Sequence, residues 1–362
     1  MSKLQELIKK LCPDGVEFRK LGEVCEIKRG VRVVKNDLIN DGKYPVFQNS
    51  LIPLGYYDKN NYPANITFVI SAGAAGEIGY TEEPIWAADD CLTIISPNNI
   101  INKFIYYCLI ANKLFFVSKV RRASVPRLSR TVVDNFEIPI PPLEVQNEIV
   151  RILDTFTSHT AELQAELQAR KEQYEYYRNK LLTFDENDER VKWMKLGEIG
   201  NVCSGKNRDK NPIGTYPVYG STGIIAYTEN YSYCDERILI ARVGANAGYT
   251  HVAFGKYDVS DNTLIVDLKE GVNLKYVYYT LVNLNLNKYA KGGGQPLITA
   301  GEIKTIQIPI PPLSEQQRIV SILDKFESLV NDLTAGLPAE IAAVQEQYEY
   351  YRNKLLTFER KS

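Results

Sequence analysis

The sequence is poor in the residues that most enzymes use for acid–base chemistry and in the patterns that hold metals. Its 362 residues include two histidines, His159 and His251, and six cysteines without a CxxC pair. Because zinc sites and disulfide frameworks need clustered ligands or paired thiols, neither is expected. We expect the thiols to be buried in a reducing compartment.

Long apolar runs and a charge excess are missing as well. No run reaches the roughly 18 apolar residues that span a bilayer, and the start, MSKLQELIKKL, predicts an amphipathic helix rather than a signal peptide. We therefore expect a cytoplasmic protein with no membrane partner. The net charge of −1 argues against a non-specific basic coat for nucleic acids, but it allows a local basic surface.

Motifs for nucleotides and cofactors are incomplete. GNVCSGKN has Asn207 where a Walker A loop has Ser or Thr, and the residues before it do not look like a buried strand, so a turn is predicted. GAAGEIG at 73–79 lacks the GxGxxG spacing and predicts a turn between strands. The Asn-Pro-Pro-aromatic element of base methyltransferases does not occur. The sequence therefore predicts a non-catalytic chain that binds no cofactor itself.

What the chain does contain is a duplication. VEFRKLGEV at 16–24 matches VKWMKLGEI at 191–199, and FEIPIPPLEVQNEIVRILDTF at 136–156 matches IQIPIPPLSEQQRIVSILDKF at 306–326. QYEYYRNKLLTF at 173–184 recurs unchanged at 347–358. KYPVFQNS at 43–50, DDCLTII at 89–95 and NKFIYYCLI at 102–110 also have counterparts in the same order. Chance does not keep so many matched segments in order, so the chain has two similar halves.

Each half predicts a β-rich globular domain followed by a long helix. Short β-rich runs such as ITFVI and RILIA are broken by turn residues, and one helix is expected near 102–117 and one near 274–287. IPIPP predicts an extended stop before each long helix. Residues 143–182 and 313–356 carry apolar stripes at steps of four and three, the pattern of paired helices.

The expected fold is therefore α+β, with two globular domains joined by two long antiparallel coiled-coil helices. The predicted boundaries are an N-terminal helix at 1–15, a first domain at 16–136, a central spacer helix at 137–190, a second domain at 191–306 and a C-terminal spacer helix at 307–362. The second spacer has four more residues than the first between IPIPP and QYEYY. We expect a coiled coil to absorb this insertion as a stutter, by local unwinding, beside Gly336 and Pro338.

The scaffold segments of the two halves match closely, but the loops between these segments differ. Basic residues are concentrated in the loops. Arg and Lys attract phosphates, and Arg, Asn or Gln can pair with base edges in the major groove. Ordinary solvated surface would also explain any one of these clusters. The candidate DNA-binding residues are Lys28, Arg29, Arg32, Lys35, Gln48, Asn49, Arg121, Arg122, Arg127, Lys206, Arg208, Ser221, Thr222, Arg242, Asn246, Lys291 and Gln295.

These features resemble the specificity subunit of type I restriction-modification systems. The resemblance covers essentially the whole chain and rests on LCPDGVEFRKLGEV, on two PIPPL motifs each followed by ILDxF, and on TAELQAELQARKEQYEYYRNKLL and GLPAEIAAVQEQYEYYRNKLLTF. It implies two target-recognition domains that each read half of an interrupted DNA sequence. It also implies helical spacers that set the gap and dock two methylation (M) subunits. S-adenosylmethionine, ATP and Mg²⁺ would belong to the M and restriction (R) subunits.

Tyrosine is favoured at interfaces, so the repeated Tyr-rich helix ends are the predicted docking residues, Tyr174, Tyr177, Tyr348 and Tyr351. Two other classes of protein stay open at this point. The chain could be a structural adaptor whose helices assemble partners without DNA, or a single-chain enzyme that fuses recognition to methylase and nuclease segments. The second would need segments for which 362 residues leave no room.

Overall fold

The computed structural model describes residues 3–206, 214–332 and 334–361. Arg208 and Leu333 lie outside these residues, as does the side chain of Lys35. The described chain forms two compact units, residues 1–164 with 340–362 and residues 165–339.

The first unit holds a four-stranded antiparallel sheet in the order β2-β8-β5-β6. Its strands are β2 (Glu26–Arg29), β8 (Cys91–Ile95), β5 (Ile66–Ile70) and β6 (Ile78–Thr81). A smaller sheet contains β4 (Gly55–Tyr57), β3 (Tyr44–Phe47) and β7 (Trp86–Ala87), and a pair contains β1 (Phe18–Lys20) and β9 (Glu137–Pro139). The helices are α1 (Lys3–Leu11), α2 (Leu21–Val24), η1 (Lys35–Asp37), α3 (Asn102–Ala111), α4 (Lys113–Ser118), α5 (Arg130–Asp134), the start of α6 (Leu143–Leu182) and most of α11 (Leu337–Leu355).

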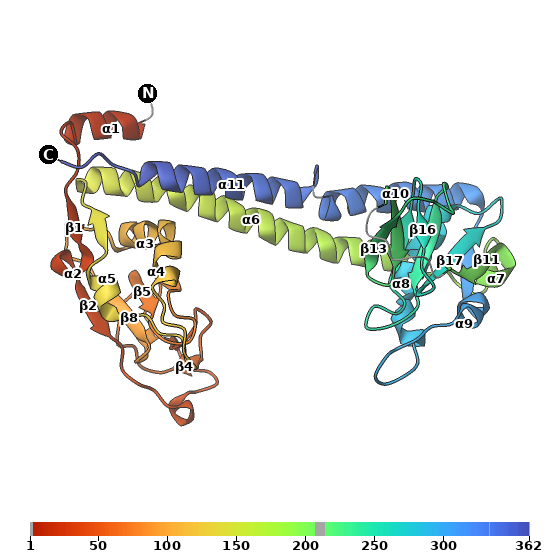
Figure 1. The fold of residues 1–362 in the computed structure, drawn as a ribbon, viewed down its shortest axis with the longest axis horizontal. Helices are drawn as coiled ribbons and strands as arrows, with labels where there is room; N and C mark the ends of the chain where they lie inside the picture. The colour runs from red at the N-terminus through yellow and green to blue at the C-terminus, as the bar shows by residue number, and fades with distance from the viewer. Residues whose placement is uncertain (1–2, 207–213, 333, 362) are drawn as a thin grey trace. The chain divides into compact units, whose positions relative to one another are not determined.

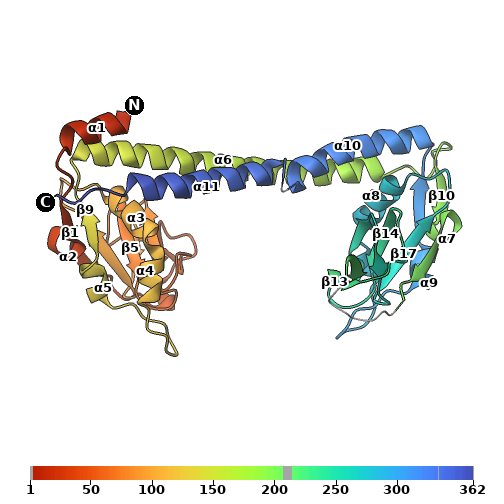
Figure 2. The same ribbon diagram turned by 45° about the horizontal axis from the view of Figure 1, so that its top comes forward.

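The second unit repeats this plan. Its four-stranded sheet has the order β11-β17-β14-β15, with β11 (Gly200–Ser204), β17 (Thr263–Leu268), β14 (Arg237–Ala241) and β15 (Thr250–Ala253). The remaining strands are β13 (Gly223–Thr228), β12 (Tyr216–Gly220) and β16 (Asp258–Val259) in one sheet, and β10 (Lys192–Lys195) with β18 (Gln307–Ile310) in a pair. The helices are the end of α6, α7 (Leu196–Ile199), α8 (Leu274–Leu284), η2 (Leu286–Tyr289), α9 (Ala300–Thr305) and α10 (Leu313–Asn331). Figures 1 and 2 show both units.

The strands form where β-branched and aromatic residues run without a break, because such side chains pack well on a pleated surface. Every residue of β5, ITFVI, is buried, and four of the five residues of β14, RILIA, are buried. Burial on both faces follows because one face of each sheet packs on helices and the other on the smaller sheet. The predicted α+β fold with an internal duplication is confirmed.

The long helices meet in the same way within each unit. In the first unit the ring of Phe156 on α6 stacks on Tyr351 of α11, with centroids 5.6 Å apart and planes at 25°. In the second unit Tyr177 of α6 stacks on Phe326 of α10 at 5.6 Å and 24°. Figures 1 and 2 both show α11 alongside the start of α6. The apolar stripes thus pair antiparallel, as the sequence predicts.

The second spacer differs from the expectation of one continuous helix with a stutter, because it is interrupted. Helix α10 ends at Asn331, and α11 begins at Leu337. Asp332 has extended backbone angles, and its carboxylate accepts from the backbone N–H groups of residues 334 and 335, at 2.8 and 3.2 Å. A Cβ at Gly336 would lie 2.5 Å from a carbonyl oxygen of α10. Pro338 has no N–H to donate, so a new helix starts more easily than the old one continues.

A buried glutamine fastens each long helix to its domain. Gln146, at the start of α6, is fully buried; its Oε1 accepts from the Ile101 N–H at 2.9 Å, and its Nε2 donates to the Pro141 carbonyl at 2.7 Å. Gln316 of α10 makes the same bonds, to Asn273 at 2.9 Å and to Pro311 at 2.8 Å. The side-chain amide therefore satisfies backbone groups that no secondary structure reaches.

We expect Gln146→Leu to destabilise the first unit strongly. The substitution leaves a buried N–H and a buried carbonyl without partners, and each such loss costs about 1–3 kcal/mol. The free energy of unfolding should fall by roughly 2–6 kcal/mol in denaturant titrations. Asn147→Leu, at the exposed neighbouring position, is the control and should change stability little. Equal stability of the two variants would contradict the role of Gln146.

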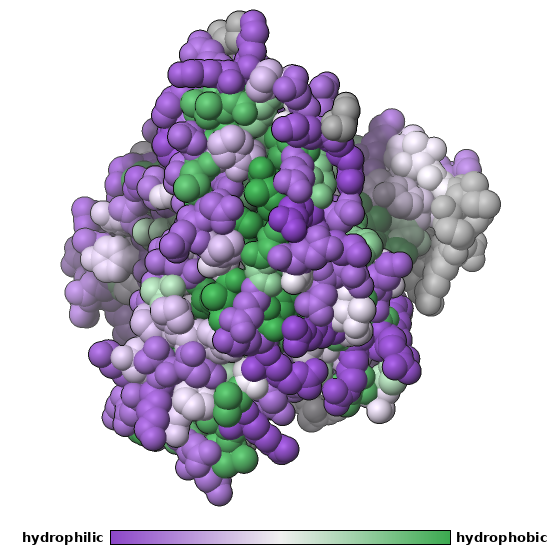
Figure 3. All heavy atoms as spheres, turned by 90° about the vertical axis from the view of Figure 1, so that its left-hand side faces the viewer, coloured by the Kyte–Doolittle hydropathy of each residue, from purple (hydrophilic) through white to green (hydrophobic). Residues whose placement is uncertain are grey.

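The predicted N-terminal helix is α1, which packs on α6. Leu4 is 3% exposed, and the Lys3 ammonium lies 2.9 Å from the Glu148 carboxylate. Arg151 lies 2.8 Å from the same carboxylate, and these two cations lower the pKa of Glu148 to about 2. The space-filling view of this end of the chain shows apolar residues in patches among polar ones (Figure 3). A charged pair at the edge of an apolar contact thus fixes the direction of α1.

Candidate nucleic-acid interface

In the first unit several loops meet at one edge of the main sheet. β2 and β5 are both antiparallel to β8, so their C-terminal ends lie at the same edge as the start of β8. There the N–H of Gly30 donates to Cys91 at 3.0 Å, and the N–H of Ser71 donates to Asp90 at 2.7 Å. The N–H of Ala88 donates to Phe47 at 2.8 Å and so brings in the end of β3.

A hairpin at residues 121–127 completes this edge. Arg121 and Arg127 pair across it through two backbone hydrogen bonds of 2.9 and 3.1 Å. The carbonyl of Pro126 accepts from Gly73 at 3.2 Å, and Leu128 donates to Ser71 at 2.8 Å. The hairpin is therefore attached to the turn after β5.

The second unit has the same network with other residues. Gly205 donates to Thr263 at 2.9 Å, Arg242 to Asn262 at 2.9 Å and Ser260 to Tyr219 at 2.9 Å. Its hairpin at 291–297 is closed by bonds of 3.0 and 2.9 Å between Lys291 and Leu297. The carbonyl of Pro296 accepts from Gly244 at 2.9 Å, and Ile298 donates to Arg242 at 2.9 Å.

These bonds establish which residues are equivalent. Ser71 corresponds to Arg242, Arg121 to Lys291 and Arg127 to Leu297. Gly30 and Gly205 share a strict packing requirement, because a Cβ on either would lie 2.2 Å from a backbone carbonyl oxygen. We term these two loop clusters the recognition edges. They have one backbone design and different side chains.

The structure brings most candidate residues of the first unit to its recognition edge. Lys28 and Arg29 end β2, Gln48 and Asn49 follow β3, and Arg121, Arg122 and Arg127 lie on the hairpin. Arg32 follows Gly30 and is exposed. Lys28 forms an ion pair with Glu26 at 2.9 Å, whereas the described residues hold no carboxylate within 4.0 Å of the hairpin arginines. Those three arginines therefore carry positive charge that the unit leaves uncompensated.

At the second recognition edge, fewer of the candidate DNA-binding residues that the structure describes are without intramolecular partners. Lys206 follows Gly205 and is exposed; Ser221 and Thr222 lie after β12, where the hydroxyl of Ser221 donates to the Asn262 carbonyl at 2.7 Å. Arg242 is half-buried, and its Nε has no partner among the described residues. Gln295 is exposed on the hairpin.

Lys291 and Asn246 have other neighbours. Lys291 forms a 2.7 Å ion pair with Glu302, which lowers the pKa of that carboxyl to about 2. A phosphate contact by Lys291 would have to replace this pair. Asn246 is exposed in the turn before β15 and lines a cavity of about 380 Å³ with Asn285 and Asn287.

Sequence reasoning missed Ser71, which lies beside Asp89 and Asp90; these two carboxylates are predicted from the sequence to be turn or capping residues, and they lie in a turn. Ser71 is equivalent to Arg242, and its hydroxyl donates to the Asp90 carbonyl at 2.9 Å. One carboxylate oxygen of Asp89 is buried without a partner among the described residues. The match between DDC at 89–91 and DNT at 261–263 was the available signal, since it places both turns at the starts of equivalent strands.

The predicted docking tyrosines lie on the helix pairs. Tyr174 is 7% exposed and packs with Phe326, as Tyr177 does. Tyr348 and Tyr351 both contact Phe156. Their neighbours in the sequence, Tyr176 and Tyr350, are 58% and 59% exposed. Docking of a partner through these helix ends stays a prediction.

Two expectations from the sequence need correction. Residues 200–204 of the Walker-like segment form strand β11, not a turn, because alternate residues of the strand are buried beside β17. Cys203 is exposed on that strand, and Cys234 is exposed as well, whereas the other four thiols are buried. Cys203 faces outward because side chains alternate along a strand.

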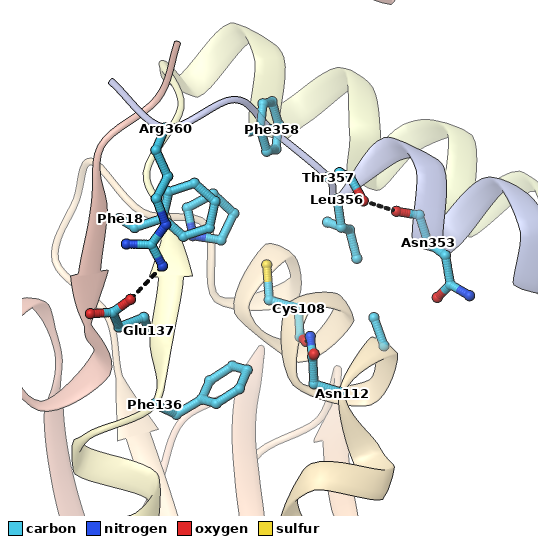
Figure 4. Close-up of a pocket in the computed structure, with 12 residues that line it drawn as sticks. Phe18, Cys108, Asn112, Phe136, Glu137, Asn353, Leu356, Thr357, Phe358 and Arg360 are labelled. Atoms are coloured by element: carbon cyan, nitrogen blue, oxygen red, sulfur yellow. Dashed lines mark hydrogen bonds and ion pairs between the residues drawn. The ribbon is translucent and has the colours of Figure 1, made fainter. Parts of the chain in front are cut away.

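A cavity of about 500 Å³ lies under the C-terminal tail in the first unit, and the two charged groups of its lining, Arg360 and Glu137, are paired with each other (Figure 4). Arg360 bonds to Glu137 at 2.5 Å and covers the ring of Phe18 at 4.4 Å. Burial raises the pKa of the Cys108 thiol, which keeps it protonated. The described residues contain no group of three His, Cys, Asp or Glu side chains placed to hold a metal ion, and no described helix could cross a membrane.

Comparison with known proteins identifies the family. The family model described as "Type I restriction modification DNA specificity domain" matches residues 13–173 and again 189–343. The chain belongs to the family of type I restriction-modification specificity subunits. It is similar to a putative type I restriction enzyme specificity subunit of Haemophilus influenzae, 33% identical over 95% of this chain and 96% of the relative. It is also similar to the EcoR124I/EcoR124II specificity subunit of Escherichia coli, 32% identical over 99% and 98%.

Solved structures agree on the fold. A crystal structure of a type I restriction-modification S subunit from M. genitalium superposes with a TM-score of 0.67 at 17% identity, covering 94% of this chain and 96% of that one. A chain from a structural study of complex assembly in the type I system gives 0.62 at 19% identity, covering 95% and 98%. The chain is therefore the DNA-recognition subunit of a type I restriction-modification complex and is not itself an enzyme. Family membership implies DNA and the M and R subunits as partners, and the adaptor alternative is not favoured.

Proposed function

We propose that each unit reads one half of an interrupted DNA target through its recognition edge. The observation that supports this is the shared backbone network with different side chains, because two similar frames with different surfaces suit two different half-sites. Three uncompensated arginines on one short hairpin provide both phosphate attraction and bidentate donors for guanine edges.

The finer assignments follow from this role. DNA contacts are made by the candidate residues named above, and the chain binds no cofactor; S-adenosylmethionine, ATP and Mg²⁺ are used by the partner subunits. Because its target is chromosomal or invading DNA, the complex works in the cytoplasm. We take the two sheets and the strand pair of each half as a target-recognition domain, at 16–136 and 191–306, followed by the spacers at 137–190 and 307–362.

Arg121→Ala and Arg122→Ala test the first recognition edge. DNA affinity should be measured against salt concentration with the M subunit present. If the lost contact is to a phosphate, the slope should fall by about one unit with unchanged sequence preference; if it is to a base, preference should relax at one position of one half-site. Lys20→Ala on β1, in the separate β1–β9 pair, is the control. Degeneracy in both half-sites would refute the assignment of one half-site to each unit.

We further propose that two M subunits dock on the helix pairs, one for each unit. Tyr176 and Tyr350 support this, because large exposed tyrosines at equivalent positions of a duplicated helix are suited to an interface. The purified complex should have a mass that fits one S chain and two M chains. The isolated chain should bind DNA poorly and should not stay a stable, monodisperse monomer, because its docking surfaces are left exposed. A stable monomer that binds its target specifically without M subunits would contradict the proposal.

A further inference from the structure

A surface cavity of about 570 Å³ in the first unit belongs neither to the recognition edge nor to the Tyr-rich helix ends alone. Its walls come from β6 and α3 of the globular domain, from the start of α6 and from α11. It is termed the α3–α11 cavity. Its polar lining includes Lys103, Tyr106, Tyr107, Thr157, Tyr348 and Arg352.

Part of the polar lining is fully paired. The Lys103 ammonium lies 2.6 Å from the Glu82 carboxylate and 3.0 Å from that of Asp154. Asp154 also accepts from the Tyr107 hydroxyl at 2.5 Å. Both carboxylates at this cavity are therefore engaged with Lys103.

Two donors at the cavity have no acceptor among the described residues. The Nε of Arg352 is buried and unbonded, and the guanidinium lies over the ring of Tyr348 at 5.3 Å. The Tyr106 hydroxyl, whose pKa is raised by burial, makes no hydrogen bond to a described residue and stays a donor. The Arg352 guanidinium and the Tyr106 hydroxyl thus both lie at the cavity, and neither has a carboxylate partner among the described residues.

The second unit shows what satisfies the same donors. There Tyr278 and Tyr279, equivalent to Tyr106 and Tyr107, donate to the Glu327 carboxylate at 3.3 and 2.6 Å. Arg178, equivalent to Arg352, donates from Nε to the Asn283 amide oxygen at 3.3 Å. Both groups come from within the unit.

The first unit lacks both acceptors. IVRILDTFT at 149–157 matches IVSILDKFE at 319–327, so Thr157 occupies the position of Glu327. NKFIYYCLIA at 102–111 matches LKYVYYTLVN at 274–283, so Ala111 occupies the position of Asn283. At these two positions the first unit has neither the anion nor the amide oxygen, although it has the equivalent arginine and tyrosines.

We propose that the α3–α11 cavity binds a carboxylate carried on an apolar or aromatic body. The carboxylate takes the place of the missing Glu327 group, between Arg352 and Tyr106. Arginine pairs well with carboxylates in a planar, charge-assisted geometry. The rest of the lining combines Ile110, Ala161 and tyrosine side chains with the neutral polar side chains of Thr160, Gln164 and Gln345, which suit an uncharged, partly apolar body better than a second charge. The carboxylate comes from a free acid or from an acidic side chain of a partner subunit.

The direct test uses 3-(4-fluorophenyl)propionate as a probe, followed by its ¹⁹F resonance as the full-length chain is added. We expect line broadening by the wild-type chain and little by the neutral 3-(4-fluorophenyl)propionamide. Arg352→Gln should weaken binding of the acid roughly tenfold or more, because a charged hydrogen-bond partner is lost. Tyr106→Phe should weaken it less.

Two further variants separate this site from general stickiness. Thr157→Glu installs the acceptor that the second unit carries, so it should abolish probe binding while the chain remains folded. Arg178→Gln, in the second unit, should leave probe binding unchanged. No binding of the acid to the wild-type chain, equal binding of acid and amide, or equal effects of Arg178→Gln and Arg352→Gln would each overturn the proposal.

The same probe distinguishes the two sources of the carboxylate. If the ligand is a free acid, the probe also binds the chain in complex with M subunits. If it is a partner's side chain, complex formation displaces the probe, and Arg352→Gln and Thr157→Glu weaken the complex roughly tenfold or more. Both results support the proposal, and neither depends on the reading of DNA, which should be unaffected in the Tyr106→Phe variant.

Discussion

Replacing residues 121–127, RRASVPR, by the equivalent hairpin KGGGQPL should abolish recognition of the first half-site and preserve the second. Both hairpins have seven residues, and both are closed by two backbone bonds and fixed through a proline carbonyl. The exchange therefore keeps every backbone bond and replaces three arginines by one lysine. The backbone frame should fold as before.

The expected loss is large because bidentate contacts to bases contribute about 1–3 kcal/mol each. Loss of two such contacts lowers affinity by roughly 30-fold or more. The exchange is made in this direction because Gly292 has φ +108°, a conformation that side chains rarely adopt. Glycine tolerates either backbone, whereas placing Arg at that position in the second unit would add strain.

The measurement is a methylation map of cells that express the variant with its M subunit. We expect methylation at the native target to disappear, and any new target to share the second half-site. A control variant with Ser124→Gly alone changes the hairpin without removing charge and should keep the native target. An unchanged map for the full exchange would show that the hairpin does not read DNA.

The sequence predicted the frame well because its signals are local or repeated. Each signal lies within one segment of the sequence: the apolar run of β5, the prolines before the long helices and the apolar stripes of those helices. Because the chain is duplicated, each signal also occurs twice. Gln146 shows the limit: its amide satisfies Ile101, whose N–H is far away in the sequence. Such a bond has no periodic signature, so it could not be found from one sequence.

The recognition edges were predictable only in part for the same reason. The basic loops could be recognised from their composition, and the hairpin arginines do lie in an exposed loop, as the sequence predicts. The equivalence of Ser71 and Arg242 depends on backbone bonds to turns in other segments. The pairing of Lys291 with Glu302 likewise depends on a tertiary contact. The interruption at Asp332 went unpredicted because an insertion of four residues fits a stutter as well as a break, and the close approach of Gly336 to α10 decides between them.

Deleting Ala165–Gln168 should shorten the unread gap of the DNA target by one base pair. α6 is one unbroken helix over 143–182, and these residues are the second copy of the tandem AELQ unit at 161–164 and 165–168. After the deletion Leu163 stands three residues before Arg170, a step that the stripe already uses. The helix should therefore form and pair as before.

The size of the change follows from helix geometry. Four residues contribute about 6 Å of rise and leave a net rotation of about 40°. One base pair of DNA is roughly 3.4 Å long and, at 10–10.5 pairs per turn, rotates by about 35°. The loss of helix rise matches the length of nearly two base pairs, whereas the helix rotation matches the rotation of one base pair. Rotation should prevail, because a recognition edge that turns away from its groove loses its base contacts, whereas a few ångströms of rise can be absorbed at the interrupted second spacer.

A methylation map of the deletion variant gives the result directly. Both half-site sequences should be unchanged, and only the number of bases between them should fall. Replacing residues 165–168 by four alanines keeps the length and is the control, for which the gap should stay the same. If the deletion leaves the gap unchanged, or alters the half-site bases, α6 does not set the spacing. In that case the spacing depends on the second spacer, where Asp332 and Gly336 hold the break between α10 and α11.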